Sequence, residues 1–317
     1  MATYVLRKLL YNIPVYLGIV LFLMACLRVN DPVSGYLGKN ASEEDYVAQK
    51  ASMGLDRPFV VQYAVFLGKL ATFDFSEQSW SQEGRTVGEI LRSAIVPSLS
   101  ITVPALALTT LISIVIALIS AYYRGRLPDK LMMVSAVLGM SISFLVYIIF
   151  GQYWGAYVLN ERTGSELFAV QGYEPGVGNW AHFCLLPVLI STIVAMGYDT
   201  RFYRAVMVEE SARDYITTAR AKGATKRKIM FVHMLKNAMI PIITRIMITL
   251  PFLVMGSLLL EVYFNIPGMG RALYDSITVN DFPVTQMLVA IFAGIFILSV
   301  ILTDVLYALV DPRVRLS

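Results

Sequence analysis

The chain has 317 residues, of which 57% are hydrophobic and only 15% charged, with a mean hydropathy of +0.64 and a formal charge of +4. Soluble domains carry about 25% charged residues, so the composition excludes an ordinary soluble protein and indicates that lipid surrounds much of the chain. Two cysteines and two histidines without metal-ligand spacing exclude a disulfide framework and predict neither a metal site nor a cofactor site.

Six apolar runs predict an all-α, polytopic membrane protein with six transmembrane helices. The first run follows Arg7 and Lys8 and is longer than the apolar region of a signal peptide, about 7–15 residues, so we expect residues 1–29 to form a retained transmembrane helix. A five-helix core is expected over residues 95–317. The predicted spans are Leu9–Leu27, Ile95–Tyr122, Leu131–Leu159, Phe183–Tyr198, Ala238–Leu260 and Pro283–Val310.

Two of these spans have features that need support from neighbours. The second span contains Pro97 and Pro104, which are tolerated in a membrane helix when neighbouring groups bind the freed carbonyls. The fourth span has only about 16 apolar residues and must include flanking residues to cross a bilayer, which takes roughly 20.

The distribution of lysine and arginine predicts the direction of the spans. Residues 201–237 carry nine basic and three acidic residues, whereas residues 30–94 carry six basic and nine acidic ones. Because basic loops stay in the cytoplasm, we expect both termini in the cytoplasm and residues 30–94 outside. Within that external segment, apolar residues over Leu55–Leu70 have helical spacing, and Arg57-Pro58 favours a helix start.

The basic loop 201–237 contains one predicted amphipathic helix. Ala212, Tyr215, Ile216 and Ala219 recur at the spacing of one helical face. Gly223 favours a positive φ that ends the helix, and Thr225 is a suitable cap for the next one.

Three cations, Lys226, Arg227 and Lys228, occupy the first turn of that next helix, where the helix dipole disfavours positive charge. Anionic lipid headgroups or an acidic partner surface would offset this cost. The simpler interpretation is that these residues only set the orientation of the chain in the membrane.

The segment RFYRAVMVEESARDYITTARAKGATKRKIMFVHMLKNAMIP, residues 201–241, resembles the cytoplasmic loop of ABC-importer permeases, and its form is most similar to the dipeptide/oligopeptide permease family. The general Glu-Ala-Ala-x-x-x-Gly pattern is present only in part, since Thr217 and Thr218 replace its glutamate and first alanine. His233-Met234-Leu235-Lys236 replaces the general Ile-x-Leu-Pro, as in the peptide subfamily, in which a later proline matches Pro241.

The resemblance extends over nearly the whole chain. It includes YVLRKLLYNIPVYLG and RVNDPV near the start, MGLDRPFVVQ in the external segment, GSLLLEVYFNIPGMG after span five, DFPVTQ at the start of span six and DVLYALVDPRVR at the end. Within the fourth of these, Pro267-Gly268 is suited to a type II turn in which the glycine takes a positive φ.

In this family the loop forms a coupling helix that docks in a cleft of an ATPase subunit. The resemblance therefore implies ATPase coupling through an apolar stripe, a basic rim and a terminal turn. The residues concerned are Asp214, Tyr215, Ile216, Thr217, Thr218, Ala219, Arg220, Ala221, Lys222 and Gly223.

A few charged residues near the spans are candidates for the pathway or the external loop. Glu261 and Arg271 are suited either to the two ends of a peptide or to a structural role in the loop. Asp304 lies inside span six and Asp199 at the cytoplasmic end of span four, close to Arg201, where each carboxylate is either paired structurally or part of the pathway.

The resemblance implies the permease subunit of a dipeptide or oligopeptide importer in the bacterial inner membrane. Its expected partners are a second permease, two cytoplasmic ATPases, an external binding protein and membrane lipids, with no nucleic acid. No phosphate-binding loop or catalytic constellation occurs, so ATP hydrolysis is expected on other subunits and the chain is not expected to be an enzyme. Alternatives are a permease for a nickel chelate or sugar and an ion-coupled secondary transporter.

Overall fold

The computed structural model describes residues 2–29, 31, 33, 37 and 42–310, and this part of the chain is helical apart from loops and one isolated bridge between Gln78 and Thr86. The all-α class is confirmed. The helices are α1 (Ala2–Leu27), α3 (Glu43–Ser52), α4 (Phe59–Thr72), α5 (Val87–Tyr122), α6 (Leu127–Ser141), α7 (Phe144–Phe150), η1 (Gly151–Val158), α8 (Leu159–Thr163), α9 (Val177–Glu210), α10 (Asp214–Ala221), α11 (Lys226–Lys228), η2 (Ile229–Met234), α12 (Leu235–Met255), α13 (Leu258–Tyr263), α14 (Met269–Thr278) and α15 (Phe282–Val310).

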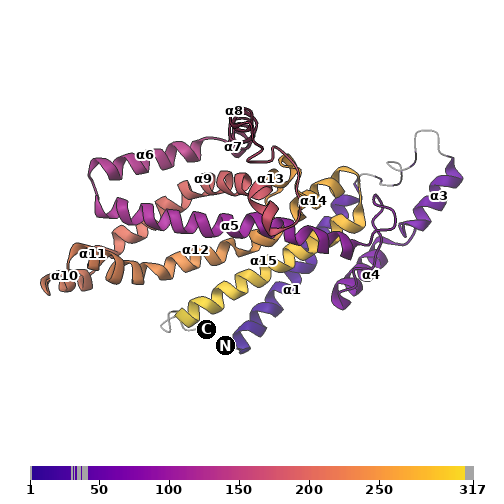
Figure 1. The fold of residues 1–317 in the computed structure, drawn as a ribbon. Coiled ribbons are helices and arrows are strands. Elements are labelled where there is room, and N and C mark those ends of the chain that lie inside the picture. Colours follow the sequence, from indigo (N-terminus) through magenta and orange to yellow (C-terminus); the bar gives the residue numbers. More distant parts are fainter. Residues whose placement is uncertain (1, 30, 32, 34–36, 38–41, 311–317) are drawn as a thin grey trace.

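The long helices lie side by side, with α10 and α11 at one end of the bundle and α3, α4 and α14 towards the other (Figure 1). Within the described residues, five helices are long and apolar enough to cross a membrane, and α6 with α7–α8 adds a sixth crossing only if that bent pair is counted as one span. Residues 311–317, with Arg313 and Arg315 of the family's closing motif, lie outside the described residues.

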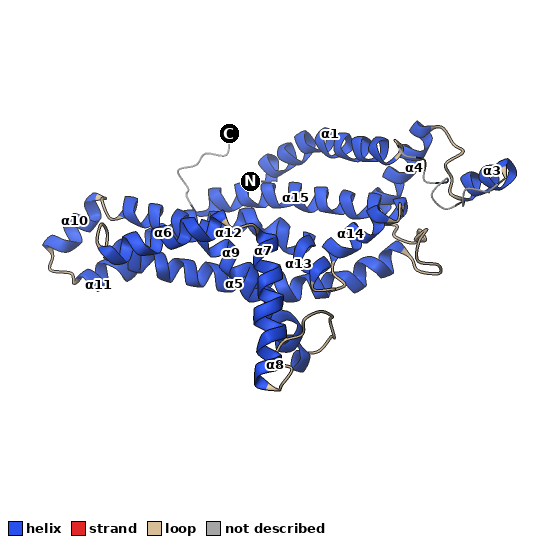
Figure 2. Cartoon of the chain, turned by 90° about the horizontal axis from the view of Figure 1, so that it is seen from above, coloured by secondary structure: helices blue, strands red, loops and turns tan. Residues whose placement is uncertain are grey.

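The third predicted span is not one straight helix. Its two parts meet at an angle of 91°, and α7–η1–α8 projects away from the bundle (Figure 2). The bend occurs because Ile142 and Ser143 adopt ψ values of 133° and 141°, and the Ser143 carbonyl then accepts from Val146 N at 3.0 Å to start α7. More than half of each of the Tyr153 and Trp154 side chains is exposed on this arm.

The fourth and fifth spans have different boundaries from those predicted. Helix α9 has 34 residues rather than about 16, because its polar part from Asp199 to Glu210 stays helical beyond the apolar stretch. Helix α12 ends at Met255, since Gly256 takes a φ of +74° and separates it from α13. The external helix predicted over Leu55–Leu70 begins later, at Phe59, after Pro58.

One of the two prolines of α5, Pro104, has the support that was expected of both. Pro104 cannot donate a hydrogen bond to the carbonyl of Ser100, four residues earlier. Trp180 Nε1 of α9 donates to that carbonyl at 2.8 Å. The extensive packing of α5 against α9 therefore includes a bond that replaces a missing helical one.

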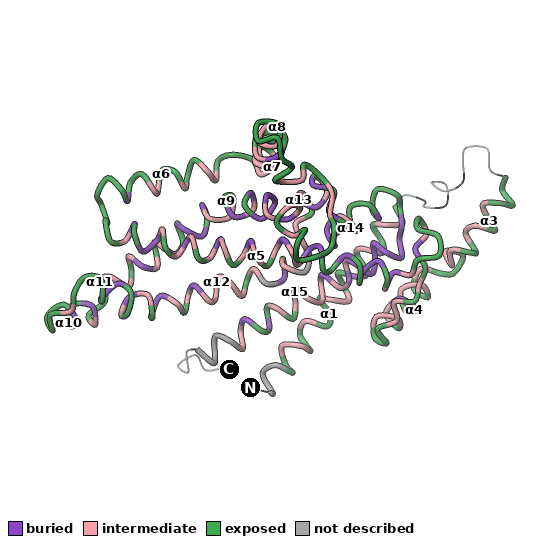
Figure 3. Tube along the Cα trace, in the orientation of Figure 1, coloured by how far each residue is buried: buried purple, intermediate pink, exposed green. Residues whose placement is uncertain are grey.

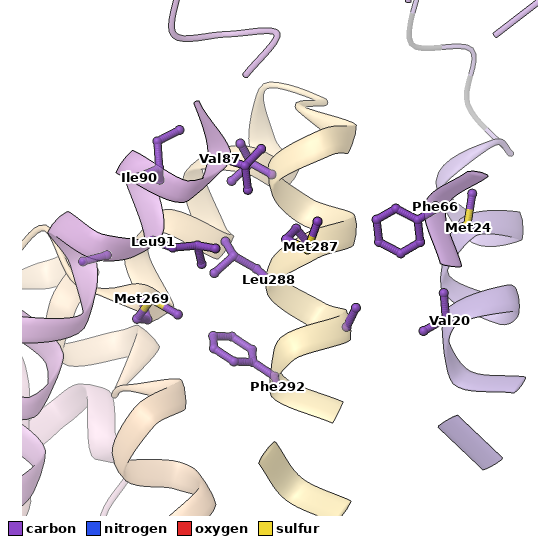
Figure 4. Close-up of a cluster of buried hydrophobic side chains, with 13 residues drawn as sticks. Val20, Met24, Phe66, Val87, Ile90, Leu91, Met269, Met287, Leu288 and Phe292 are labelled. Atoms are coloured by element: carbon purple, nitrogen blue, oxygen red, sulfur yellow. The ribbon is translucent and has the colours of Figure 1, made fainter. Parts of the chain in front are cut away.

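Buried residues lie mostly on the inner sides of the helices, whereas α6 and α8 are largely intermediate or exposed (Figure 3). One apolar cluster joins α1, α4, α5, α14 and α15. In Figure 4, Met287 of α15 points towards Phe66 of α4, and Leu288 lies beside Leu91 of α5. Helix α4, which belongs to the segment predicted to be external, is thus packed onto the helix bundle rather than forming a separate domain.

Candidate functional site

Helix α10 coincides with the predicted docking element, and its apolar stripe faces its own chain. Ile216 and Ala219 are buried against Tyr203 and Met207 of α9 and Met230 of η2. The expectation that this stripe contacts an ATPase is therefore wrong, because a short amphipathic helix already buries its apolar face here. The exposed residues of the segment are Asp214, Thr217, Thr218, Arg220, Ala221, Lys222 and Gly223.

The end of α10 is formed as predicted. Gly223 has a φ of +79°, and the amides of Gly223 and Ala224 donate to the carbonyls of Arg220 and Ala219 at 3.0 and 3.1 Å. Thr225 caps the next helix by accepting from Lys228 N at 3.3 Å. The α10–α11 corner therefore has a defined geometry at the end of the bundle.

One of the three crowded cations has a partner within the chain. Lys226 Nζ donates to the carbonyl of Tyr122, the last residue of α5, at 2.9 Å and lies 3.8 Å from the centroid of the Tyr122 ring. The negative end of the α5 dipole thus offsets this charge. Arg227 and Lys228 are exposed and extend the basic surface formed by Arg220 and Lys222.

A buried ion pair supports this end of the bundle. The Asp129 carboxylate accepts from Arg204 Nε and Nη2 at 2.6 and 2.7 Å, from Gly125 N at 2.8 Å and from the Ser120 hydroxyl. Asp129 is only 2% exposed. The contacts join the α5–α6 turn to α9, so Arg204 has a structural partner and is not merely an orientation charge.

We expect Arg204→Met to destabilise the folded chain by about 3 kcal/mol, because breaking a buried pair leaves Asp129 charged and uncompensated. Thermal unfolding in detergent micelles measures the effect. Arg213→Met is the matched control, since Arg213 pairs at 2.7 Å with the exposed Glu209 and such surface pairs contribute about 0–1 kcal/mol. Equal shifts in the two variants would contradict the structural role of Asp129–Arg204.

At the opposite end, Glu261 of α13 has no exposed surface. Its carboxylate accepts from the Ser98 hydroxyl of α5 at 2.6 Å, from Ser257 N at 3.2 Å and from Arg271 N at 3.0 Å. Burial raises the pKa of the Glu261 carboxyl, while these hydrogen bonds and one from the Gly270 amide act in the opposite direction. Since two of the amides belong to the first turn of α14, the carboxylate caps that helix.

Three glycines make room for this carboxylate. A Cβ at Gly256 would lie 2.8 Å from Ser98 Oγ, one at Gly268 2.5 Å from the same atom, and one at Gly270 2.8 Å from Leu258 Cα. The type II turn predicted at Pro267-Gly268 is wrong, since Gly268 has a φ of −96°. Gly268 is required for the close approach of Glu261 and Ser98, not for a positive φ.

The other charged candidates are paired within the chain. Arg271 Nε lies 3.4 Å from Asp275 on α14, and Asp304 of α15 lies 3.1 Å from Lys8 Nζ of α1. Asp199 pairs not with Arg201 but with Arg245 of α12, at 3.1 Å. The Arg271–Asp275 pair lies within α14, the Asp304–Lys8 pair joins α15 to α1, and Glu261 is buried and not open to a ligand.

The buried Asp281 is a further structural carboxylate that the sequence did not single out. It accepts from Trp80 N and Ser81 N, both at 3.2 Å, and from the hydroxyls of Ser79 and Ser81. These contacts attach the external segment to the start of α15. In the sequence, only the family-like DFPVTQ stretch pointed to Asp281, and it gave no indication of the residues that bind this carboxylate.

Comparison with known proteins places this architecture among transport proteins. Residues 113–316 match the model of the family described as "Binding-protein-dependent transport system inner membrane component". The chain is 34% identical over 320 residues to the glutathione transport system permease protein GsiC of Salmonella paratyphi A, with 99% of each chain covered. It is 30% identical over 322 residues to the probable peptide ABC transporter permease protein y4tP of Sinorhizobium fredii, with 99% of this chain and all of the relative covered.

Proposed function

Because this chain belongs to the family of binding-protein-dependent transport system inner membrane components, we propose that it forms half of the translocation pathway of an ATP-driven importer for short peptides. The observation that carries the proposal is the end-to-end match to relatives named as glutathione and peptide permeases. Glutathione is itself a tripeptide. A permease for a nickel chelate or sugar remains the alternative, and no contact in the described chain favours it.

The expected partners are a second permease, two cytoplasmic ATPases and an external binding protein. The exposed outer face of α10, which carries Arg220 and Lys222, supports an interaction with the ATPase, because no other described segment covers it. Packed helix bundles can switch between two arrangements, so binding of the ATPase at α10 could move the bundle as a rigid body. The chain itself is the permease subunit, and we assign ATP hydrolysis to the separate ATPases.

Reconstitution tests the proposed cargo. The permease pair, the ATPases and the binding protein are assembled in proteoliposomes, and uptake of a labelled tripeptide, a sugar and a nickel chelate is compared with ATP inside. We expect ATP-dependent uptake of the peptide alone. Uptake of the sugar or chelate in preference to the peptide would show that the proposed peptide cargo is wrong. Uptake without ATP would overturn the ATP-driven mechanism.

Orientation is tested by cysteine labelling in a chain in which Cys26 and Cys184 are replaced by alanine. We expect Lys222→Cys on the exposed face of α10 to react with an impermeant thiol reagent only when the cytoplasmic side is open. Gln82→Cys, exposed in the external segment, is expected to react from the outside. The reverse pattern would place α10 outside the cell and exclude ATPase coupling through it.

A further inference from the structure

A groove lies between the membrane helices α5, α9 and α12. Its volume is about 330 Å³, within the lower range of small-molecule sites, about 300–1,000 Å³. It is lined by apolar residues and by the polar residues Thr102, Thr109, Ser191, Tyr198, Asp199, Arg245, Thr249 and Ser257. The charged pair of this groove, Asp199 and Arg245, is unfavourable against lipid tails.

Arg245 lies near the middle of its span. It is nine residues after Lys236 and eleven before Gly256, which at 1.5 Å per residue corresponds to about 13 and 16 Å along the helix. A charge at this depth is unfavourable against lipid and is found at bundle interiors or water-filled cavities. The partner is Asp199, whose Oδ1 lies 3.1 Å from Arg245 Nε.

The pair leaves part of the guanidinium available. Only Nε contacts Asp199, and the two terminal nitrogens of Arg245 have no hydrogen-bond partner among the described residues. The Arg245 side chain is 37% exposed, whereas that of Asp199 is 9% exposed. Since N–H donors without a partner are strongly unfavourable in hydrocarbon, the groove must hold water or a hydrogen-bond acceptor.

Two parallel N–H donors of a guanidinium match the two oxygens of a carboxylate. Every unmodified peptide ends in a carboxylate. Tyr198, which is 49% exposed, and Thr249 border the same groove and offer hydroxyls to the adjoining peptide bond. Asp199 reduces the net charge of the site, which favours a contact weak enough for cargo to leave.

We propose that Arg245, held by Asp199, is a contact on the wall of the translocation pathway for the terminal carboxylate of the transported peptide. This inference rests on the proposed function. It gives the importer a preference for peptides with a free carboxyl end that is independent of selection by the external binding protein.

The first test asks whether the groove is wet and does not depend on the cargo. In the chain with Cys26 and Cys184 replaced by alanine, we expect Thr249→Cys to react with a charged, impermeant thiol reagent in the assembled complex. Leu111→Cys is the control, since Leu111 is 61% exposed on α5 but does not line the groove. Equal reactivity at both positions, or none at Thr249→Cys, would overturn the inference.

The second test compares uptake of one tripeptide as the free acid and as the C-terminal amide, with both first shown to bind the external protein. In the neutral double variant Arg245→Gln/Asp199→Asn, we expect uptake of the acid to fall roughly tenfold, because the hydrogen bonds from the guanidinium to the charged carboxylate are lost. Uptake of the amide is expected to stay close to that of the wild type. Uptake of the acid by Arg245→Lys is expected to lie between that of the wild type and that of the double variant, since lysine keeps the positive charge but lacks the two parallel N–H donors.

The outcomes separate the two proposals. A purely structural ion pair would change acid and amide uptake by the same factor, or neither, and would overturn the carboxylate contact while leaving the peptide importer intact. A wild-type complex that hydrolyses ATP but moves neither peptide would overturn the proposed function, and the carboxylate contact with it.

Discussion

Ala221→Trp is expected to abolish peptide uptake while the chain still inserts, folds and binds its partner permease. Ala221 is exposed on the outer face of α10, one turn after Thr217, so a larger side chain meets nothing in its own chain. In a partner cleft, however, overpacking typically costs 1–3 kcal/mol or more, and the ATPase would be displaced. Uptake and peptide-stimulated ATP hydrolysis are both expected to fall at least about tenfold.

The matched control is Ala212→Trp. Ala212 is also an exposed alanine, but it lies before the docking segment Asp214–Gly223. Co-purification with the ATPase measures docking, and melting of the chain in detergent measures folding. Normal uptake by Ala221→Trp would contradict the docking assignment, and an equal loss in Ala212→Trp would show that the contact extends beyond α10.

Gly268→Ala is expected to destabilise the chain strongly, because the new Cβ would lie 2.5 Å from Ser98 Oγ and against the Glu261 carboxyl. Neither partner can withdraw, since Glu261 is fully buried and Ser98 Oγ also accepts from Met269 N at 2.8 Å. Separating them leaves buried donors and a buried charge without partners, at about 3–5 kcal/mol. Thermal unfolding in micelles measures the loss.

Gly68→Ala provides the control for that experiment. Gly68 lies in α4, and a Cβ there meets no atom within 4 Å. Alanine is favoured over glycine in a helix by about 1 kcal/mol, so this variant is expected to be unchanged or slightly more stable. Glu261→Ala should reproduce the loss seen with Gly268→Ala, because it removes the same hydrogen bonds. A stable Glu261→Ala chain would refute the proposed basis of the effect.

The membrane helices were predictable because a bilayer requires long apolar runs, and α1, α5 and α15 follow that requirement directly. The residues at which the helices end were not predictable. Helix α9 continues through Asp199–Glu210, where charged residues interrupt the apolar run, and α6 ends at Ser141 although the apolar run continues. A turn that depends on a glycine with positive φ was predictable at Gly223, because helix termination is local in sequence.

The partners of the polar residues required the fold. Asp129 and Arg204 are 75 residues apart, and Glu261 and Ser98 are 163 apart, so neither spacing nor composition connects them. Gly268 also could not be interpreted from the sequence alone. Its neighbours in the sequence predict a turn, whereas in the structure a glycine is needed there because the Glu261 carboxylate lies so close. Arg245 was overlooked because one cation in a long apolar run has no local pattern.

Helix α5 is anchored at two serines, and this has a mechanical consequence. Ser98 donates to Glu261 near one membrane face, and Ser120 donates to Asp129 near the other. The 22 residues between them span about 33 Å, close to the roughly 30 Å of a hydrocarbon layer. With Arg204 of α9 bonded to the second anchor and α14 capped by the first, we expect sliding of α5 along its axis to break one anchor or the other. We therefore expect any tilt of α5 to carry α9 and α14 with it.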